Sequence, residues 1–334
     1  MNEKASFGLV PTNAAYEAAY DPVEENWGEG RWLDPAQNIE VPMQSLVFSY
    51  AYSVFEGMKA YRLADRNSAM IFRAADHAKR MARSAGAVYL QPFPEDHFIK
   101  AIIELVQRNA EHIPLAGEGA LYLRPVLFAD EAKLGLNPSE SARFTVYASP
   151  VKPYFSGQSG GLRLKILPRS RVAKEGIGWA KCSANYAGSL RGMLEARSEG
   201  FNDAVYTEDD GRTMTEATGA NLFFLLRNGT VVTPAANDQI LPGITRDSVL
   251  TLLRQEDIRV EERPMSVNEA FSATEMFCTG TAWGVVGVED LVSESDGSKH
   301  YDSNELSSSL AKKMRQIQSG SVSDPFNSPT IELQ

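Results

Sequence analysis

The feature that most constrains the fold is a short run of small and polar residues near the middle of the chain. Residues 156–161 read Ser-Gly-Gln-Ser-Gly-Gly, which leaves little side chain to bury and a flexible backbone. A chain of 334 residues also suits about two domains. The run therefore predicts an N-terminal domain at 1–155, a linker at 156–161 and a C-terminal domain at 162–334. A loop inside a single domain would have the same composition.

Both halves mix strand patterns with helix patterns, as expected of an α+β protein. In the first half, alternating β-branched and aromatic content predicts strands at residues 46–50, 58–63, 69–72, 120–127 and 144–149. Apolar stripes at helical spacing predict helices at 74–85 and 95–110. In the second half the same patterns predict strands at 162–167, 204–207, 222–226, 231–232 and 276–279, and helices at 187–199 and 245–255. The tail after Gln318 is rich in Ser, Pro and Asn and is expected to be loop.

Charge and composition exclude several classes of function. The formal net charge of −10 and the pI near 5.1 argue against a nucleic-acid partner or an anionic membrane surface. No stretch reaches the roughly 18 uninterrupted apolar residues of a membrane span, and residues 1–6 lack the pattern of a signal peptide. Cys182 and Cys278 are too few for a disulfide framework. A reducing cytoplasm is the simplest expectation.

The sequence shows neither a histidine-based metal site nor a glycine-rich nucleotide-binding loop. The chain has four histidines, and none is placed at metal-ligand spacing from another, so no metal is expected. No Gly-x-Gly-x-x-Gly follows a strand and no Walker-type loop is present. If the chain is an enzyme, its reactive group is a lysine or a bound cofactor.

One lysine stands in an unusual setting. Lys181 lies within Gly176-Ile177-Gly178-Trp179-Ala180-Lys181-Cys182-Ser183-Ala184-Asn185-Tyr186, among small and apolar neighbours just before a predicted helix. Removing a lysine from water favours the neutral, nucleophilic amine, which can form a Schiff base. Taken alone, the lysine is more typical of a surface lysine at the end of a loop.

Three further segments of the second half offer groups that suit a phosphorylated, ring-containing ligand. Leu241-Pro242-Gly243-Ile244-Thr245-Arg246-Asp247 opens a helix, where unpaired N–H groups bind anions; Thr245 is either its N-cap or a phosphate donor. Thr279-Gly280-Thr281-Ala282 ends a strand with hydroxyl donors. Glu216, before an apolar strand, can hold a pyridinium nitrogen protonated if it is buried. An ordinary capped helix, a turn and a solvated loop acid are the alternatives.

The order of these residues resembles the fold-type IV pyridoxal-phosphate enzymes, and within them the branched-chain aminotransferases. The resemblance implies that Lys181 forms the Schiff base with pyridoxal 5′-phosphate and that Tyr186 bonds the cofactor phenolate. It implies that Glu216 contacts the pyridine nitrogen, and that phosphate donors fall on Ile244, Thr245 and Thr281. The implied fold has a smaller N-terminal α/β domain and a larger C-terminal domain with a barrel-like β core.

The first half carries the same resemblance. Phe55-Glu56-Gly57-Met58-Lys59-Ala60-Tyr61-Arg62 is similar to the family's signature strand, and Arg73 stands where the family has a phosphate-binding arginine. The segment Leu121-Tyr122-Leu123-Arg124-Pro125 matches the substrate-pocket segment. The resemblance implies substrate contacts from Tyr50, Tyr122, Arg124 and Ala282, with Leu134 and Leu136 closing the pocket of the partner subunit in a homodimer.

The activity that the resemblance implies is transamination of leucine, isoleucine and valine with 2-oxoglutarate. Two positions depart from the pattern of many animal members, because Trp283 and Val286 occupy the places of a Cys-x-x-Cys redox pair. Trp283 is also bulky and near the expected pocket, so it affects the size of the substrate side chain that the pocket can accept. A D-amino-acid aminotransferase, an amine transaminase, an aminodeoxychorismate lyase and a catalytically silent binding protein remain the alternatives.

Overall fold

The structure is a computed structural model that describes residues 8–65, 67–154 and 160–333. Contacts divide the chain into two units. Unit 1 comprises Met1–Ser156, Ala180–Ala184 and Arg315–Gln334, and unit 2 comprises Gly157–Trp179 and Asn185–Met314. Positions 156–159 of the predicted linker lie outside the described residues. Each unit is described by itself.

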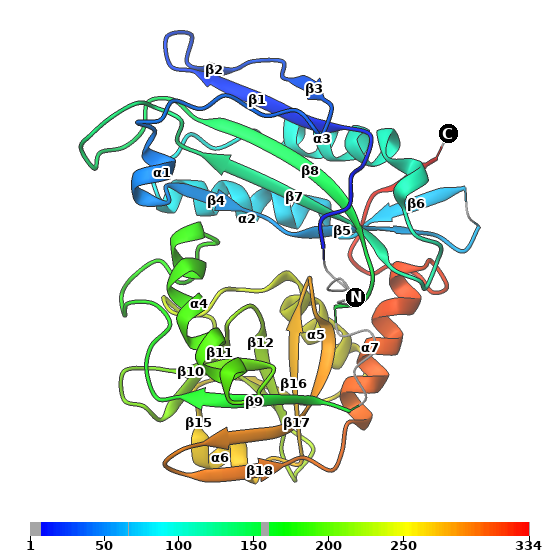
Figure 1. The fold of residues 1–334 in the computed structure, drawn as a ribbon. Helices are drawn as coiled ribbons and strands as arrows, with labels where there is room; N and C mark the ends of the chain where they lie inside the picture. Colours follow the sequence, from blue (N-terminus) through cyan, green and yellow to red (C-terminus); the bar gives the residue numbers. More distant parts are fainter. Residues whose placement is uncertain (1–7, 66, 155–159, 334) are drawn as a thin grey trace. The chain divides into compact units, whose positions relative to one another are not determined.

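Unit 1 contains a nine-stranded sheet in its described part (Figure 1). The main path runs β19-β6-β5-β7-β8-β1-β2, with β3 paired to β1 and β4 paired to β7, and every pairing is antiparallel. The strands are β1 (Ala15–Asp21), β2 (Asn26–Trp27), β3 (Arg31–Leu33), β4 (Ser53–Phe55), β5 (Met58–Arg62), β6 (Ser68–Ile71), β7 (Ala120–Phe128), β8 (Arg143–Val151) and β19 (Thr330–Glu332).

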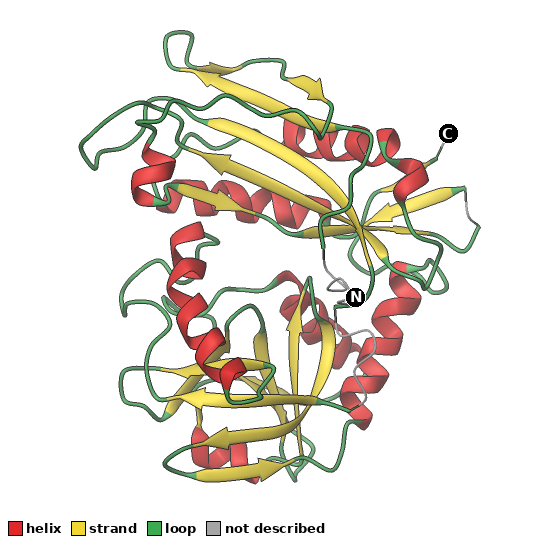
Figure 2. Ribbon diagram, in the orientation of Figure 1, coloured by secondary structure: helices red, strands yellow, loops and turns green. Residues whose placement is uncertain are grey.

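Helices α2 (Ala74–Ala87) and α3 (Glu95–Arg108) pack on this sheet, and both were predicted (Figure 2). The apolar residues of α2 recur at helical spacing, so Ala78, Met81 and Ala85 share a buried face. In α3 the buried face includes Phe98, whose ring lies 5.8 Å from that of Phe144 on β8. A 3-10 turn at Ala110–His112 follows α3.

The predicted strand at residues 46–50 is wrong, because Leu46–Tyr50 form helix α1. A run of five residues, four of them apolar or aromatic, is too short for its periodicity to separate a strand from a helix. Long-range contacts decide the matter, since the Leu46 N–H donates to Glu131 O at 3.1 Å and the Ser45 hydroxyl to Asp130 O at 2.8 Å. Ala51 then ends the helix in the left-handed region at φ 50°.

Unit 2 contains a ten-stranded mixed sheet in its described part, in the order β14-β13-β12-β16-β17-β9-β10-β11-β15, with β18 paired to β17. The pairs β9–β10, β9–β17 and β13–β14 are parallel. The strands are β9 (Leu162–Leu167), β10 (Asp203–Thr207), β11 (Thr213–Ala217), β12 (Asn221–Leu225), β13 (Val231–Thr233), β14 (Val260–Glu262), β15 (Met265–Ser266), β16 (Glu275–Gly280), β17 (Gly284–Ser293) and β18 (Gly297–His300).

Four helices complete the fold described for residues 160–333: α4 (Ser183–Ser198), α5 (Ile244–Gln255), α6 (Val267–Ser272) and α7 (Glu305–Gln318). The leucines that recur at helical spacing in α4 do not lie on its buried face. Leu190 and Leu194 are 49% and 53% exposed, whereas Ser189, Gly192 and Ala196 are buried. A side chain at Gly192 would overlap the Tyr206 hydroxyl, so this face is set by close approach and not by apolar size.

The tail after Gln318 is not loop throughout. Residues 330–332 form β19, which pairs antiparallel with β6. Three residues are too few to show an alternating pattern, so only the pairing partner identifies the strand. Within the described ranges no helix combines the length and the apolar composition needed to cross a membrane.

Candidate functional site

The segment that carries Lys181 belongs by its contacts to unit 1. The Lys181 N–H donates to the Ser84 hydroxyl of α2 at 3.0 Å, and the Phe55 N–H donates to Lys181 O at 3.1 Å. An antiparallel bridge between Val54 and Cys182 extends this pairing. The peptide of Lys181 is therefore held on both sides, like a short strand added to β4.

The side chain of Lys181 approaches an aromatic ring that also contacts an arginine. Lys181 Nζ lies 4.6 Å from the centroid of Phe55, and the Arg124 guanidinium carbon lies 4.8 Å from the same centroid. Both distances suit cation–π attraction. Within unit 1, Lys181 and Arg124 therefore both contact the ring of Phe55.

Tyr122 joins this group through Arg124. Arg124 Nη2 donates to the Tyr122 hydroxyl at 2.8 Å. A side chain at Gly57 would overlap that hydroxyl, so the glycine of the Phe-Glu-Gly motif makes room for the tyrosine. Within the described chain, the buried Nε of Arg124 has no hydrogen-bond acceptor. Arg124 can therefore donate a hydrogen bond to a further polar group.

Arg73 lies at the start of α2, where its backbone adopts φ 54°, and its side chain is almost fully buried. Its Nε pairs with Asp76 Oδ2 at 2.6 Å, and its guanidinium lies 4.9 Å from the Phe326 ring centroid. A left-handed residue that is not glycine is costly, and such strain persists only where the surroundings enforce it. The conformation points to a position under functional or structural constraint.

One turn further along α2 lies a fully buried ionic cluster. Glu56 accepts from His77 Nδ1 at 2.7 Å and from Arg80 Nε and Nη2, also at 2.7 Å. Burial opposes ionisation of Glu56, but the Arg80 guanidinium and His77 together hold its pKa well below the usual range. Burial in turn lowers the pKa of His77, against the opposing effect of Glu56.

The predicted pocket residues Tyr50 and Leu134 also meet in unit 1. The Tyr50 hydroxyl donates to Leu134 O at 2.9 Å. Leu134 and Leu136 are 92% and 70% exposed, which is unusual for leucine. The loop therefore presents apolar side chains to its surroundings.

In unit 2, Glu216 lies on β11 and is only 4% exposed. Its Oε1 pairs with Arg171 Nη2 at 2.5 Å, and its Oε2 accepts from Asn221 Nδ2 at 3.2 Å. The Leu241 N–H lies 3.3 Å from both oxygens. These contacts exclude the alternative of a solvated loop acid.

Tyr186 lies on α4, and the Arg171 guanidinium carbon is 6.0 Å from its ring centroid. Arg171 therefore contacts two of the residues that the sequence singled out in unit 2. Its Nε is buried and has no acceptor among the described residues.

Ile244 and Thr245 form the first turn of α5, and both are 7% exposed. The N-cap is Gly243, so of the two alternatives for Thr245 the structure excludes the capping role. A side chain at Gly243 would overlap the Asn221 side-chain oxygen, which is why a glycine precedes the helix. The helix N-terminus supplies N–H donors and positive potential.

Thr281 and Ala282 lie in the turn between β16 and β17 and are partly buried, as is Trp283. Just before them, Thr279 is fully buried and its hydroxyl has no partner among the described residues. A buried hydroxyl without a partner costs about 1–3 kcal/mol, so a polar group at this turn would be favoured.

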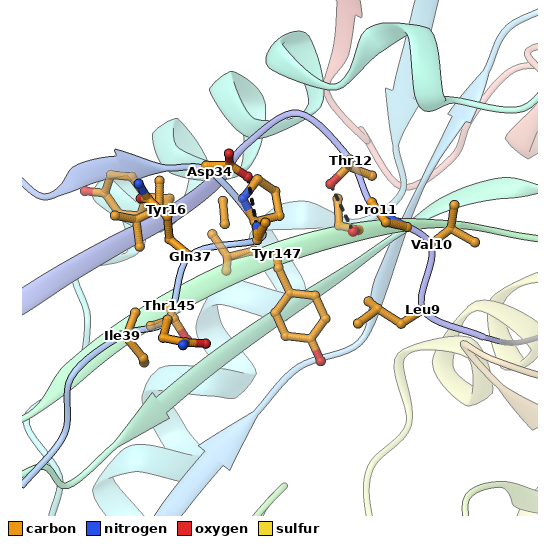
Figure 3. Close-up of a pocket in the computed structure, with 17 residues that line it drawn as sticks. Leu9, Val10, Pro11, Thr12, Tyr16, Asp34, Gln37, Ile39, Thr145 and Tyr147 are labelled. Carbon is orange, nitrogen blue, oxygen red and sulfur yellow. Dashed lines mark hydrogen bonds between the residues drawn. The ribbon is translucent and has the colours of Figure 1, made fainter.

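A separate cavity of about 670 Å³ lies in unit 1 (Figure 3). It is lined by residues 9–12, 33–39 and 145–148 together with Ala15 and Tyr16. None of the predicted site residues is among them. No group of three or more potential metal ligands occurs in the part of the chain that the structure describes.

Sequence patterns did not assign roles to Ser84, Asn221 and Arg171, and named Phe55 only as part of a motif. Ser84 lies 97 positions from Lys181, and Arg171 lies 45 positions from Glu216. No local spacing signals such pairings. The one available hint is that Arg171 stands in the same loop segment as Lys181, ten residues before it.

Comparison with known proteins identifies the family. The family model for amino-transferase class IV matches residues 53–291. The chain belongs to the class IV aminotransferase family. This confirms the resemblance seen in the sequence, and the matched range includes Lys181, Glu216 and Thr281.

Individual class IV aminotransferases match almost the whole chain. Branched-chain-amino-acid aminotransferase 6 of Arabidopsis thaliana is 36% identical over 96% of this chain and 90% of its own. Methionine aminotransferase BCAT4 of the same plant is 34% identical over the same shares. The solved branched-chain aminotransferase of the thermophilic archaeon Thermoproteus uzoniensis, with norvaline, has a TM-score of 0.80 and 26% identity, covering 93% of this chain and 96% of that one. The predicted α+β fold is confirmed.

Proposed function

We propose that this chain transfers amino groups between the branched-chain L-amino acids leucine, isoleucine or valine and 2-oxoglutarate, with pyridoxal 5′-phosphate as cofactor. The observation that carries the proposal is the setting of Lys181, with both peptide groups held in place and its amine 4.6 Å from the Phe55 ring centroid. Relatives that match over nearly the full length carry the name branched-chain aminotransferase. A solved branched-chain aminotransferase that is 25% identical is complexed with N-(5′-phosphopyridoxyl)-L-glutamate, which supports the cofactor.

The residues present fit a phosphorylated pyridine. Arg73 offers a guanidinium, Thr245 and Thr281 offer hydroxyls, and Ile244 lies at a helix N-terminus, a donor set typical of phosphate sites. The unpartnered buried hydroxyl of Thr279 also favours a polar ligand. We assign the phosphate to these residues, the phenolate oxygen to Tyr186, the ring nitrogen to Glu216 and the aldehyde carbon to Lys181.

When bound, the cofactor accepts the electron pair left at the α-carbon of the substrate. The chain supplies the rest of the chemistry. The Lys181 amine, once released by the incoming amino acid, would be the base that takes the α-proton and delivers it to the cofactor C4′ within the same half-reaction, and 2-oxoglutarate would run these steps in reverse. The buried carboxylate of Glu216 keeps a proton on the ring nitrogen, because its negative charge stabilises the cationic ring.

The substrate contacts that we propose come from Tyr50, Tyr122, Arg124 and Ala282. The paired Arg124 and Tyr122 provide a polar end that suits a carboxylate, and the adjacent Phe55 ring provides an apolar wall. In a homodimer, Leu134 and Leu136 of the partner subunit would close the apolar side. Their high exposure in this chain supports that role.

The domain division at residues 156–161, the homodimer and a cytoplasmic location also remain proposals. The compartment differs among the relatives, since some are named mitochondrial and others chloroplastic.

A second candidate substrate is methionine, because one relative that matches 96% of the chain is named methionine aminotransferase. Methionine has an unbranched side chain that is longer and narrower than that of leucine, so the width and depth of the pocket distinguish the two.

A panel of amino donors with 2-oxoglutarate tests the proposal. Leucine, isoleucine and valine should give kcat/KM values at least about tenfold above methionine, D-alanine and 1-phenylethylamine, a discrimination that a few methylenes in an apolar pocket can supply. Preference for methionine would favour the second candidate, and preference for a D-amino acid or amine would contradict both.

The catalytic lysine is tested in the same assay. Lys181→Ala should abolish turnover and the absorbance of the lysine-bound cofactor while the fold is kept. Lys174→Ala is a matched control, because Lys174 is exposed and lies seven residues earlier in the chain. Turnover of Lys181→Ala at the level of Lys174→Ala would refute the proposed function.

A further inference from the structure

Arg171 is a charged partner of the carboxylate that the proposed function places on the cofactor ring. The contact between Arg171 Nη2 and Glu216 Oε1 is 2.5 Å, and the two side chains are 4% and 5% exposed. Hydrogen bonds between ionised groups are short and strong, and burial removes the screening by water. The proposed chemistry has so far given Arg171 no role.

The same guanidinium also reaches two side chains of α4. Its carbon lies 6.0 Å from the Tyr186 ring centroid, and its Nη1 lies 3.5 Å from the Ser189 hydroxyl. Arg171 therefore links the two groups proposed for the phenolate oxygen and the ring nitrogen. The neutral contacts on Glu216, from Asn221 and Leu241, orient the carboxylate but do not balance its charge.

We propose that Arg171 is a positioning residue that keeps Glu216 ionised and correctly oriented for the cofactor ring nitrogen. The inference rests on the proposed function. A carboxylate removed from water without a cation tends to take up a proton, and a neutral carboxyl group no longer stabilises a charged ring. With Arg171 in place, Glu216 is charged before the cofactor arrives.

A second consequence concerns geometry. Arg171 holds one carboxylate oxygen while Asn221 holds the other, so the plane of the carboxylate is fixed. Catalytic groups displaced by about 1 Å can lose two orders of magnitude in rate. A lysine at position 171 would restore the charge but not the planar, forked donor geometry.

Three variants separate these effects. Arg171→Met removes the charge, Arg171→Lys keeps it, and Arg169→Met is the control. Arg169 is in the same loop and pairs with Glu195 at 2.6 Å, but those side chains are 45% and 36% exposed. Such an exposed ion pair contributes little to the stability of the fold. Circular dichroism and cofactor content establish that each variant is folded and loaded.

Two readouts report on Glu216 and not merely on stability. The first is the ¹⁵N chemical shift of labelled cofactor, which distinguishes a protonated from a neutral ring nitrogen. The second is the single-turnover rate of α-proton removal from leucine, which isolates that step from product release. Arg171→Met should shift the nitrogen toward the neutral form and slow the step about 10- to 100-fold. Arg171→Lys should lie between, and Arg169→Met should match the unsubstituted enzyme.

A double-mutant cycle provides the decisive comparison. If Arg171 acts through Glu216, then Arg171→Met should slow Glu216→Gln by less than about twofold, because the group it positions is already gone. A purely structural role predicts the full additional loss, and that outcome overturns the proposal. If Arg171→Met does not fold, the same double-mutant cycle is measured with Arg171→Lys. Wild-type nitrogen shift and rate in the folded Arg171 variant also overturn it.

The inference and the proposed function fail in different ways. If the proposed function is wrong, Lys181→Ala keeps its turnover. Failure of the Arg171 inference appears only in the ¹⁵N shift and in the cycle, while Lys181→Ala remains inactive.

Discussion

At the scale of single residues, Asp203 is a buried acid that the proposed chemistry does not use. It is 2% exposed, and burial raises its pKa to about 6, although a hydrogen bond from Thr218 at 2.6 Å favours the ionised form. The ordinary value is 3.8, so the folded state binds the proton more tightly than the unfolded state. The associated stability is complete below pH 3.8 and is lost as the pH rises through 6.

Asp203→Asn should therefore stabilise the protein above pH 6. The shift from 3.8 to about 6 is about 2 pH units, or roughly 3 kcal/mol at ~1.36 kcal/mol per unit, as an upper figure. We expect the free energy of unfolding at pH 7.5 to rise by about 1–3 kcal/mol, and the gain to vanish near pH 4. Urea denaturation at several pH values measures it. Asp302→Asn, at a side chain 96% exposed, is the control. A loss of stability at pH 7.5 would contradict the assignment.

At the scale of elements, α2 carries three polar side chains on its buried face. His77, Arg80 and Ser84 are spaced by three and four residues, and so share a face. Two of them fix Glu56, and the third holds the peptide N–H of Lys181. The helix thus connects a buried ionic cluster to the backbone of the proposed catalytic lysine.

Glu56→Gln should destabilise unit 1 because it leaves the buried Arg80 guanidinium without its counter-charge. Breaking one partner of a buried ion pair costs about 3–5 kcal/mol. We expect a loss of that size in the free energy of unfolding, measured by urea denaturation. Glu95→Gln, at an exposed residue of α3, should change it by less than about 0.5 kcal/mol. A Glu56→Gln effect as small as that of the control would show that the cluster does not stabilise the fold.

At the scale of the whole molecule, the two thiols are both buried and lie in different units. Burial raises the pKa of Cys182 to about 12, and burial together with the charge of Asp203 raises that of Cys278. The thiolate is the reactive species, so both residues should be inert in the folded protein. Trp283 and Val286 occupy the two positions at which the sequence resemblance would place a Cys-x-x-Cys pair in many animal members.

We expect neither thiol to react with an aromatic disulfide reagent in the native state, and both to react after unfolding in guanidinium. Mild peroxide should leave transaminase activity unchanged. Thiol titration against time, with and without denaturant, measures the first, and a steady-state assay measures the second. Rapid activity loss that a dithiol reverses, and that persists in Cys182→Ser, would point to Cys278 and contradict the expectation.

The sequence was sufficient wherever the signal is local. Apolar spacing predicted α2, α3 and α5 to within a few residues, because a helix buries the stripe that its own sequence carries. The order of Lys181, Glu216 and Thr281 indicated the family, since reactive groups at fixed separations are rare by chance. The class IV family and the α+β fold were both predictable in this way.

Tertiary structure alone decided what depends on distant partners. Residues 46–50 form a helix because their N-terminal end, through Ser45 and Leu46, bonds to residues 130 and 131, and residues 330–332 form a strand because β6 is there to pair with. Leu190 and Leu194 are exposed because close approach at Gly192 selects the other face of α4. Arg171 meets Glu216, and Ser84 meets Lys181, across 45 and 97 positions. Such contacts arise from the folding of the whole chain and leave no periodicity in the sequence from which to read them.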